Sequence, residues 1–383
     1  MSKKQITVSA MVLKWARTTL YGANKQEAAG RLKITIAELD NLEANDPIIA
    51  VSMLKRMSKV YKRHISVLLY KNPPKSQEAP KFRKLPSFEE VEFDRKTFMA
   101  IRQAQEIQNN AIFLFENKEN LNLKELIANS GDWNKLATKL SGLLKIDKDF
   151  RFHSKNSAQQ LKMWKRSLES LGILVLEQSF PLSDIRAFTI YDKVAPIIVL
   201  NSSDTDNGRI FSLFHELGHL VQKQTDTDQI LDLSISSKHA DEYFSNNFAA
   251  TFLVPKDLLN KDVELINSFN DENVKAIANK FKVSTSVIWI RLKDFGHVNQ
   301  DKFNEIREKL STFDPFSVSI KKKDKSGGNK NTYLYTTMNR KGEFFISEVF
   351  NALNTKRLTY YEVLDFIGIR AETLPKLQKL MFT

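Results

Sequence analysis

The stretch FSLFHELGHLVQ, Phe211–Gln222, constrains this chain more than any other. It holds an H-E-x-x-H motif, in which His215 and His219 are four residues apart and Glu216 follows the first histidine. On a helix, residues four apart lie about one turn apart on one face, so two imidazoles can reach one metal ion. Stepping about 100° per residue, the apolar residues gather almost opposite the two histidines: Leu213, Phe214, Leu217, Leu220 and Val221. The pattern predicts a buried helix that turns its histidines into a cavity, with Glu216 beside them as a general base.

Two histidines can also share a helix by chance. The chain has only six His in 383 residues, so chance alone should produce this motif in fewer than about one such chain in a hundred. Gly218 lies inside the motif and weakens a helix by roughly 1 kcal/mol relative to Ala. We therefore expect a metal site here, and a close approach of another element at Gly218.

A zinc hydrolase needs a third protein ligand and leaves its fourth position for water. The downstream run HADEYFSNNFAATFLVP is a second helical pattern that ends at Pro255. Three residues share a helix face with Glu242: Asn246, Ala249 and Leu253. We predict Glu242 as the third ligand, with His239 and Asp241 as open alternatives.

The run IIVLNSSDTDNGRIFSLFHELGHLVQ followed by ADEYFSNNFAATFLVP resembles the ImmA/IrrE family of zinc metallo-endopeptidases. That family shows a short strand ending in Asn, an Arg-x-Phe-Thr-like segment, H-E-x-x-H, and then E-x-x-A-N-x-F-A-x-x-L-L-x-P. Three family positions depart mildly, and none is a ligand: Ser212, Ser245 and Phe252. The resemblance implies that His215, His219 and Glu242 hold Zn²⁺. It also implies that Glu216 is the catalytic base.

The resemblance implies a zincin-like, gluzincin-type peptidase core with a small sheet. It implies cleavage of a protein substrate, expected to be a repressor or antitoxin that carries its own helix-turn-helix, and such cleavage would relieve transcriptional repression. The alternative is a DNA-binding transcriptional regulator or antitoxin whose metallopeptidase-like domain does not catalyse.

Composition limits the partners and the compartment. A net charge of +13 allows nucleic-acid contact, although a Lys- and Asn-rich soluble surface gives the same charge without any such partner. Cysteine is absent, which excludes disulfides and thiolate ligands and fits a reducing cytoplasm. No run reaches the ~18 apolar residues of a membrane span, and Lys14 and Arg17 interrupt what would be the apolar part of a signal peptide. We expect a cytoplasmic protein with no membrane partner.

Residues 1–70 predict an all-α domain of short helices with helix-turn-helix spacing. Asn24 is a plausible N-cap for the second helix, and the third runs from Thr35 to Glu43. That third helix carries three acids and no Lys or Arg, so it would repel phosphates. We favour protein contact or regulation there over sequence-specific DNA binding.

The remaining chain predicts an α+β, mostly helical protein. A Pro-rich linker at 71–96 precedes a zinc metallopeptidase domain at 97–300, with its catalytic core at about 172–256 and a helix-turn-helix-like tail at 270–296. In that tail, DNA contact by Arg291 and Lys293 is the minor alternative to a structural role. Residues 301–383 predict a C-terminal α/β module.

Short apolar runs predict the strands. In the core these are Ile173–Leu176, Arg186–Tyr191 and Ile197–Leu200; in the C-terminal module they are Thr332–Thr336 and Glu343–Ile346. We expect the strand at Ile197–Leu200 to be the sheet edge on which a peptide substrate adds as an extra strand. We expect Arg209, which follows it, to form a surface salt bridge, with pairing to a carboxylate near the metal site as the alternative.

Overall fold

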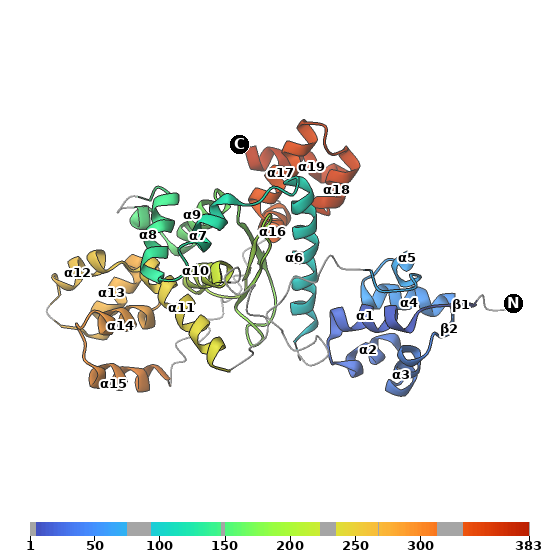
Figure 1. Ribbon diagram of the computed structural model, residues 1–383, viewed down its shortest axis with the longest axis horizontal. Coiled ribbons are helices and arrows are strands. Elements are labelled where there is room, and N and C mark those ends of the chain that lie inside the picture. Colours follow the sequence, from blue (N-terminus) through green and yellow to red (C-terminus); the bar gives the residue numbers. More distant parts are fainter. Residues whose placement is uncertain are drawn as a thin grey trace. The chain divides into compact units, whose positions relative to one another are not determined.

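The computed structural model describes residues 5–74, 93–146, 150–222, 235–266, 268–311 and 332–382. The described chain is mostly helical with two small sheets, which confirms the predicted α+β class (Figure 1). It divides into two compact units, residues 1–103 and 104–383. Within the described ranges, no helix combines the length and the apolar character needed to cross a membrane. Most of the predicted Pro-rich linker, residues 75–92, lies outside the described residues.

The first unit packs short helices around one apolar core, with Leu13, Leu39 and Met57 at its centre. The side chain of Asn24 accepts a hydrogen bond at the start of the second helix, as predicted. Thr35 and Glu38 form a reciprocal capping box at the start of the third. The helices are α1 (Ala10–Tyr21), α2 (Lys25–Leu32), α3 (Ile36–Ala44), α4 (Val51–Tyr61), α5 (Ile65–Leu68) and the first half of α6 (Arg95–Leu114).

The first unit is not all-α, so that part of the prediction is wrong. β1 (Gln5–Thr7) pairs antiparallel with β2 (Ile48–Ala50). The Asp46 carboxylate accepts a 2.8 Å hydrogen bond from the backbone of Ala10 and so holds the two segments together. Each strand has only three residues, which is too short for an alternating pattern to be recognised in the sequence.

In the second unit a three-stranded sheet carries the order β3-β5-β4. β3 (Leu174–Gln178) runs parallel to β5 (Ile197–Asn201), and β4 (Ala187–Ile190) runs antiparallel to it. The three predicted core strands are therefore confirmed, but β5 is the central strand and not the edge. Its side chains are buried along its whole length, as is typical of a strand covered on both faces and paired on both sides.

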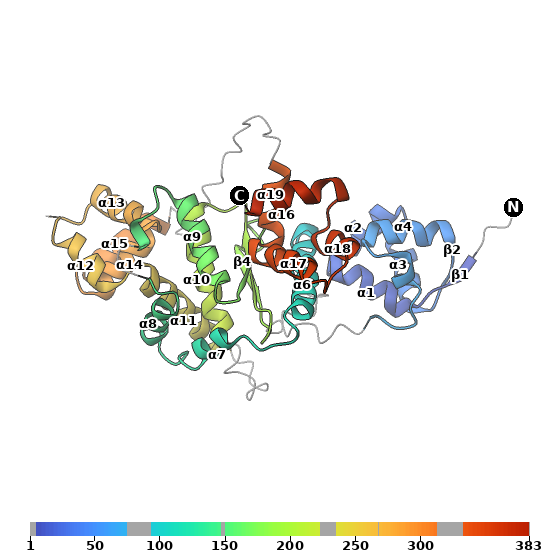
Figure 2. The same ribbon diagram turned by 90° about the horizontal axis from the view of Figure 1, so that it is seen from above.

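Helices cover both faces of this sheet, as Figure 2 shows. Val175 and Ile198 lie in register on one face and join the core that contains α10 (Asp206–Gln222). On the other face Gly342, with a φ of +86°, brings the turn before α17 against Leu176, where a Cβ would lie 3.1 Å from the leucine side chain. The core helices around α10 are α7 (Leu121–Ile127), α8 (Trp133–Leu143), α9 (Ser157–Glu169) and α11 (Ile235–Leu253).

Downstream of α11, further helices pack onto the same core. These are α12 (Lys256–Val263), α13 (Asp271–Phe281), α14 (Thr285–Asp294) and α15 (Gln300–Ser311). Arg291 on α14 is buried, and its guanidinium donates to the backbone carbonyl of Val254 and lies over the Phe295 ring. Arg291 therefore holds this tail onto the core, which agrees with the predicted structural role. The alternative of DNA contact by Arg291 and Lys293 stays a prediction.

The C-terminal module contains helices where strands were predicted, so the α/β assignment of residues 301–383 is wrong within the described residues. α16 (Thr332–Lys341) and α17 (Glu343–Asn354) replace the two strands. Both bury residues at helical spacing, such as Leu334 and Met338 on α16. Runs of aromatic and β-branched residues favour strands by composition, but four-residue periodicity decided the structure. α18 (Tyr360–Ile367) and α19 (Leu374–Phe382) complete the module.

Candidate metal centre

α10 places its apolar residues and its histidines as the spacing predicts. Leu213 and Leu217 are fully buried in the core, while the side chains of His215 and His219 keep 18% and 15% of their surface exposed. Glu216 is buried beside His215. The two imidazoles are thus anchored by a packed helix and still face accessible space.

Gly218 allows α11 to approach α10 closely, as expected. A Cβ built on Gly218 would lie 2.9 Å from both the Cα and the Oγ of Ser245. Real side-chain contacts are not that short, so the two backbones meet where a glycine is required. Ser245 lies three residues after Glu242 on α11, and the contact therefore brings that carboxylate to the histidines.

Three side chains converge on one point: His215, His219 and Glu242. The two Nε2 atoms are 3.1 Å apart. The Glu242 carboxylate lies 3.4 Å from Nε2 of His215 and 3.3 Å from Nε2 of His219. Bonds of 2.0–2.1 Å to a tetrahedral zinc ion require neighbouring ligand atoms to be about 3.3–3.4 Å apart. The observed distances come close to this value, with Oε2 of Glu242 nearest to His215 and Oε1 nearest to His219. One ligand atom from each of the three residues lies within 4.8 Å of the other two, so the donor set fits a zinc ion.

Asn246 orients the first histidine, a role that the sequence did not indicate beyond its face on the helix. Its Oδ1 lies 3.1 Å from Nδ1 of His215. When Nδ1–H donates to this amide oxygen, Nε2 keeps its lone pair toward the cluster, which is the arrangement that metal-binding histidines show. The signal in the sequence was the four-residue step from Glu242, which puts Asn246 on the ligand face of α11.

The electrostatics of the cluster favour a positive charge among the three side chains. Burial lowers the pKa of the His215 imidazole, but its hydrogen bond to Glu242 and the charges of Glu216 and Glu242 raise that pKa by more. The hydrogen bonds from His215 and His219 in turn hold the pKa of the Glu242 carboxyl well below its usual range. Glu242 is half-exposed and ionised, so a cation reaching the cluster meets a carboxylate already in its binding form.

Arg209 does not form the expected surface salt bridge. Its guanidinium is buried at the start of α10 and pairs with Glu177 on β3 and with Asp206. Glu177 also accepts a 2.7 Å hydrogen bond from the buried Lys165 of α9. This network fastens the beginning of the histidine helix to the sheet and to α9, so it fixes where the two imidazoles point.

The two alternatives for the third ligand stay predictions. His239 and Asp241 belong to the first turns of α11, but their side chains lie outside the described residues. Tyr243, the residue after Glu242, is 62% exposed, and its ring packs edge-on against Trp133 with centroids 5.8 Å apart. No described contact joins the Tyr243 hydroxyl to the cluster.

The region that carries this cluster is similar to a known peptidase family. Residues 168–293, from the end of α9 to α14, match the model of the M78 peptidase family described as IrrE N-terminal-like domain. No curated protein and no solved structure matches the chain. M78 peptidases are metallopeptidases, so the match suggests a metallopeptidase-type function for the region that carries the His-His-Glu cluster.

Proposed function

We propose that the protein is a zinc-dependent endopeptidase in which His215, His219 and Glu242 hold the metal. The observation that carries this proposal is the convergence of three donor groups, whose nearest nitrogen and oxygen atoms lie 3.1, 3.3 and 3.4 Å apart in the three residue pairs, close to the edges of a tetrahedral zinc site. The half-exposed Glu242 leaves the site accessible from solvent on the side away from the core. A fourth position can therefore face a substrate.

A zinc ion at this place supplies a Lewis acid and makes a water molecule acidic enough to lose its proton near neutral pH. Glu216 is the group we assign to accept that proton and to pass it to the leaving amine. Its neighbour His215 is fixed through Asn246, and the buried Arg209 holds the beginning of α10. The base and two ligands thus lie on a single helix whose position is set at both ends.

The substrate chain is proposed to lie along β4 and not along β5. β4 is the outer antiparallel strand, α10 packs against it, and none of the strands in the described residues pairs with its other side. The backbone N–H of Asn201 donates to the carbonyl of Arg186. Because hydrogen-bonded and non-hydrogen-bonded pairs alternate along an antiparallel ladder, Phe188 bonds to β5, and the backbone groups of Ala187 and Thr189 point away from β5. A peptide in extended form can pair with these outward groups.

The proposed substrate is a repressor or antitoxin with its own helix-turn-helix, whose cleavage relieves repression. This part rests on the family resemblance, and the first unit adds support for a protein partner. α3 exposes Glu38 and Asp40, and the only described ion pair on its surface joins Asp40 to Lys25. An acidic helix repels DNA phosphates and suits a basic protein surface.

The test is co-expression of the full chain with a helix-turn-helix repressor encoded beside it, followed by intact-mass spectrometry of the repressor. Wild type should yield two fragments whose masses add up to the substrate plus one water. Glu216→Gln should keep about one zinc per chain and lose cleavage by roughly two orders of magnitude or more, whereas His215→Ala should lose both.

The outcomes separate the two classes of function. Equal cleavage by wild type and Glu216→Gln would show that the assigned base is wrong. A repressor that stays intact while the chain binds promoter DNA, with equal affinity in wild type and Glu216→Gln, would instead support a DNA-binding regulator with a non-catalytic peptidase-like domain. Zinc content measured on the same samples shows whether the metal site was loaded.

A further inference from the structure

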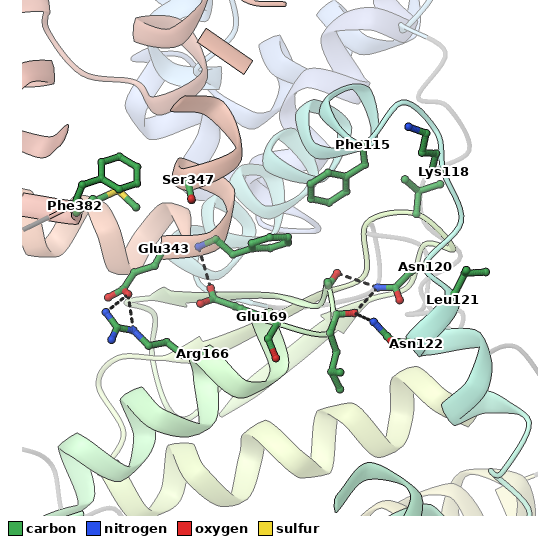
Figure 3. A pocket seen from close by; sticks show the side chains of 16 residues that line it. Phe115, Lys118, Asn120, Leu121, Asn122, Arg166, Glu169, Glu343, Ser347 and Phe382 are labelled. Carbon is green, nitrogen blue, oxygen red and sulfur yellow. Dashed lines mark hydrogen bonds and ion pairs between the residues drawn. The ribbon is translucent and has the colours of Figure 1, made fainter. Parts of the chain in front are cut away.

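An open pocket lies in the second unit, away from the His-His-Glu cluster. It has a volume of about 610 Å³, within the range of pockets that hold small molecules. One wall comes from the end of α9 and the loop before α7, and the other from α17 and α19 (Figure 3). Most of its lining is apolar, with Phe115, Phe344 and Phe382 as the largest side chains. Such a cavity binds an apolar body and uses its few polar groups for recognition.

Glu169, at the end of α9, is the polar group buried in this lining. Its side chain is 5% exposed, and Figure 3 shows it on the α9 side of the cavity, across from Phe115 and Ser347. In the described residues its only hydrogen bond is a long one, 3.5 Å, which Oε1 accepts from the backbone of Phe344. This hydrogen bond and the charges of Lys165 and Arg166 offset only part of the free energy that burial of the carboxyl costs, and a bound donor would recover more of it. Burial accordingly raises the pKa of Glu169 to about 7.

The charged and amide side chains of the lining other than Glu169 already have partners, and this decides the class of ligand. Arg166 donates twice to Glu343, at 2.9 and 3.0 Å. The amides of Asn120 and Asn122 donate to backbone carbonyls at the end of α9. The second cation of the lining, Lys118, pairs with Glu116 at 2.6 Å. Both lining cations are thus already paired with carboxylates, whereas Glu169 offers acceptor capacity to a donor.

The aromatic walls suit a cation with an apolar body. Phe115 and Phe344 pack with ring centroids 5.6 Å apart, and Phe344 is the residue whose backbone meets Glu169. Aromatic faces attract ammonium groups, and the attraction grows when water is excluded. A carboxyl beside phenylalanine rings therefore matches an organic ammonium better than it matches a neutral alcohol or a polyanion.

We propose that this cavity is a second ligand site, which binds a small organic ammonium compound with an aromatic or aliphatic body through the Glu169 carboxyl. A ligand in this place touches α9 on one side and α17 and α19 on the other. It would hold the C-terminal helices against the peptidase core, and it lies on the same helix, α9, whose Trp164 packs against Phe214 next to the first histidine.

The experiment measures binding of three probes of one shape to the full chain by ligand-observed NMR and calorimetry. The probes are 2-phenylethylamine, 2-phenylethanol and 3-phenylpropanoate, which present a cation, a neutral donor and an anion. The amine should bind at least about tenfold tighter than the other two and should raise the unfolding temperature. Glu169→Gln should remove that tenfold preference and leave the alcohol unchanged.

Two further variants keep the test decisive. Glu348→Gln makes the same charge change on α17 at a residue that does not line the cavity, and it should bind the amine like wild type. Ser347→Phe fills the cavity without touching the carboxyl and should abolish binding of all three probes. Absence of amine binding to wild type, equal affinity for amine and alcohol, tighter binding of the propanoate, or unchanged amine binding in Glu169→Gln or Ser347→Phe would each overturn the proposal.

Discussion

Replacing Gly218 by alanine tests whether the approach of α11 to α10 builds the metal site. In a helix interior alone, Gly→Ala stabilises by roughly 1 kcal/mol. Here the new Cβ would lie 2.9 Å from the Cα of Ser245, a backbone atom that moves only if α11 moves. Overpacking of this kind costs about 1–3 kcal/mol. Because the overlap outweighs the gain in helix propensity, Gly218→Ala should destabilise the second unit by about 1 kcal/mol.

The same displacement should weaken metal binding, because Glu242 is carried by α11 and both histidines by α10. Disturbing the groups that position metal ligands typically lowers metal affinity by about 10–100-fold. We expect Gly218→Ala to lower the affinity for zinc by roughly tenfold. Calorimetric unfolding of the full chain resolves stability, and competition with a coloured chelator measures zinc affinity. Two units make a single two-state fit unsafe, so the transition of the second unit should be followed separately.

Gly142→Ala is the matched control. Gly142 lies near the end of α8 in the same unit, and a Cβ there meets nothing within 4 Å. It should stabilise by up to about 1 kcal/mol and leave zinc affinity unchanged. If Gly218→Ala is stabilised as much as Gly142→Ala and binds zinc equally well, the close approach does not build the site.

Three other predictions concern single side chains. Asn246→Ala should lower zinc affinity by about 10–100-fold while Asn246→Asp, which still accepts from His215, largely retains it; chelator competition distinguishes them, and equal losses would exclude an orienting role. The folded-state pKa of Glu169, about 7, lies above its ordinary 4.5, so the stability linked to its proton is complete below about pH 4.5 and is lost as pH rises through about 7. Glu169→Gln should therefore gain up to roughly 3 kcal/mol relative to wild type between about pH 5 and pH 8 in urea unfolding, and a pH-independent difference would contradict this. Arg17→Ala leaves the buried Glu43 without the partner that now lies 2.6 Å away, and should cost the first unit about 3–5 kcal/mol in calorimetry; a loss below about 1 kcal/mol would mean that the pair contributes little.

The sequence by itself determined the elements that depend on neighbours along the chain. The histidine helix, the face of α11 that carries Glu242, and the N-cap at Asn24 all follow from spacings of three or four residues. Helical geometry fixes such spacings locally, and burial then follows the apolar stripe. Gly218 belongs to this group too, because a glycine inside a packed helix is costly unless something lies close to it.

Only the tertiary structure decided features that join distant segments. The place of β5 at the centre of the sheet depends on both of its neighbours, and a buried apolar run reads the same in either position. Arg209 is buried because Glu177, on another strand, accepts its charge, and a lone arginine in sequence carries no sign of that. The two helices that replaced the predicted C-terminal strands pack on β3 through Gly342, a contact between segments more than 160 residues apart. The pocket at Glu169 is likewise assembled from α9, α17 and α19, because the space between packed elements is not a property of any one of them.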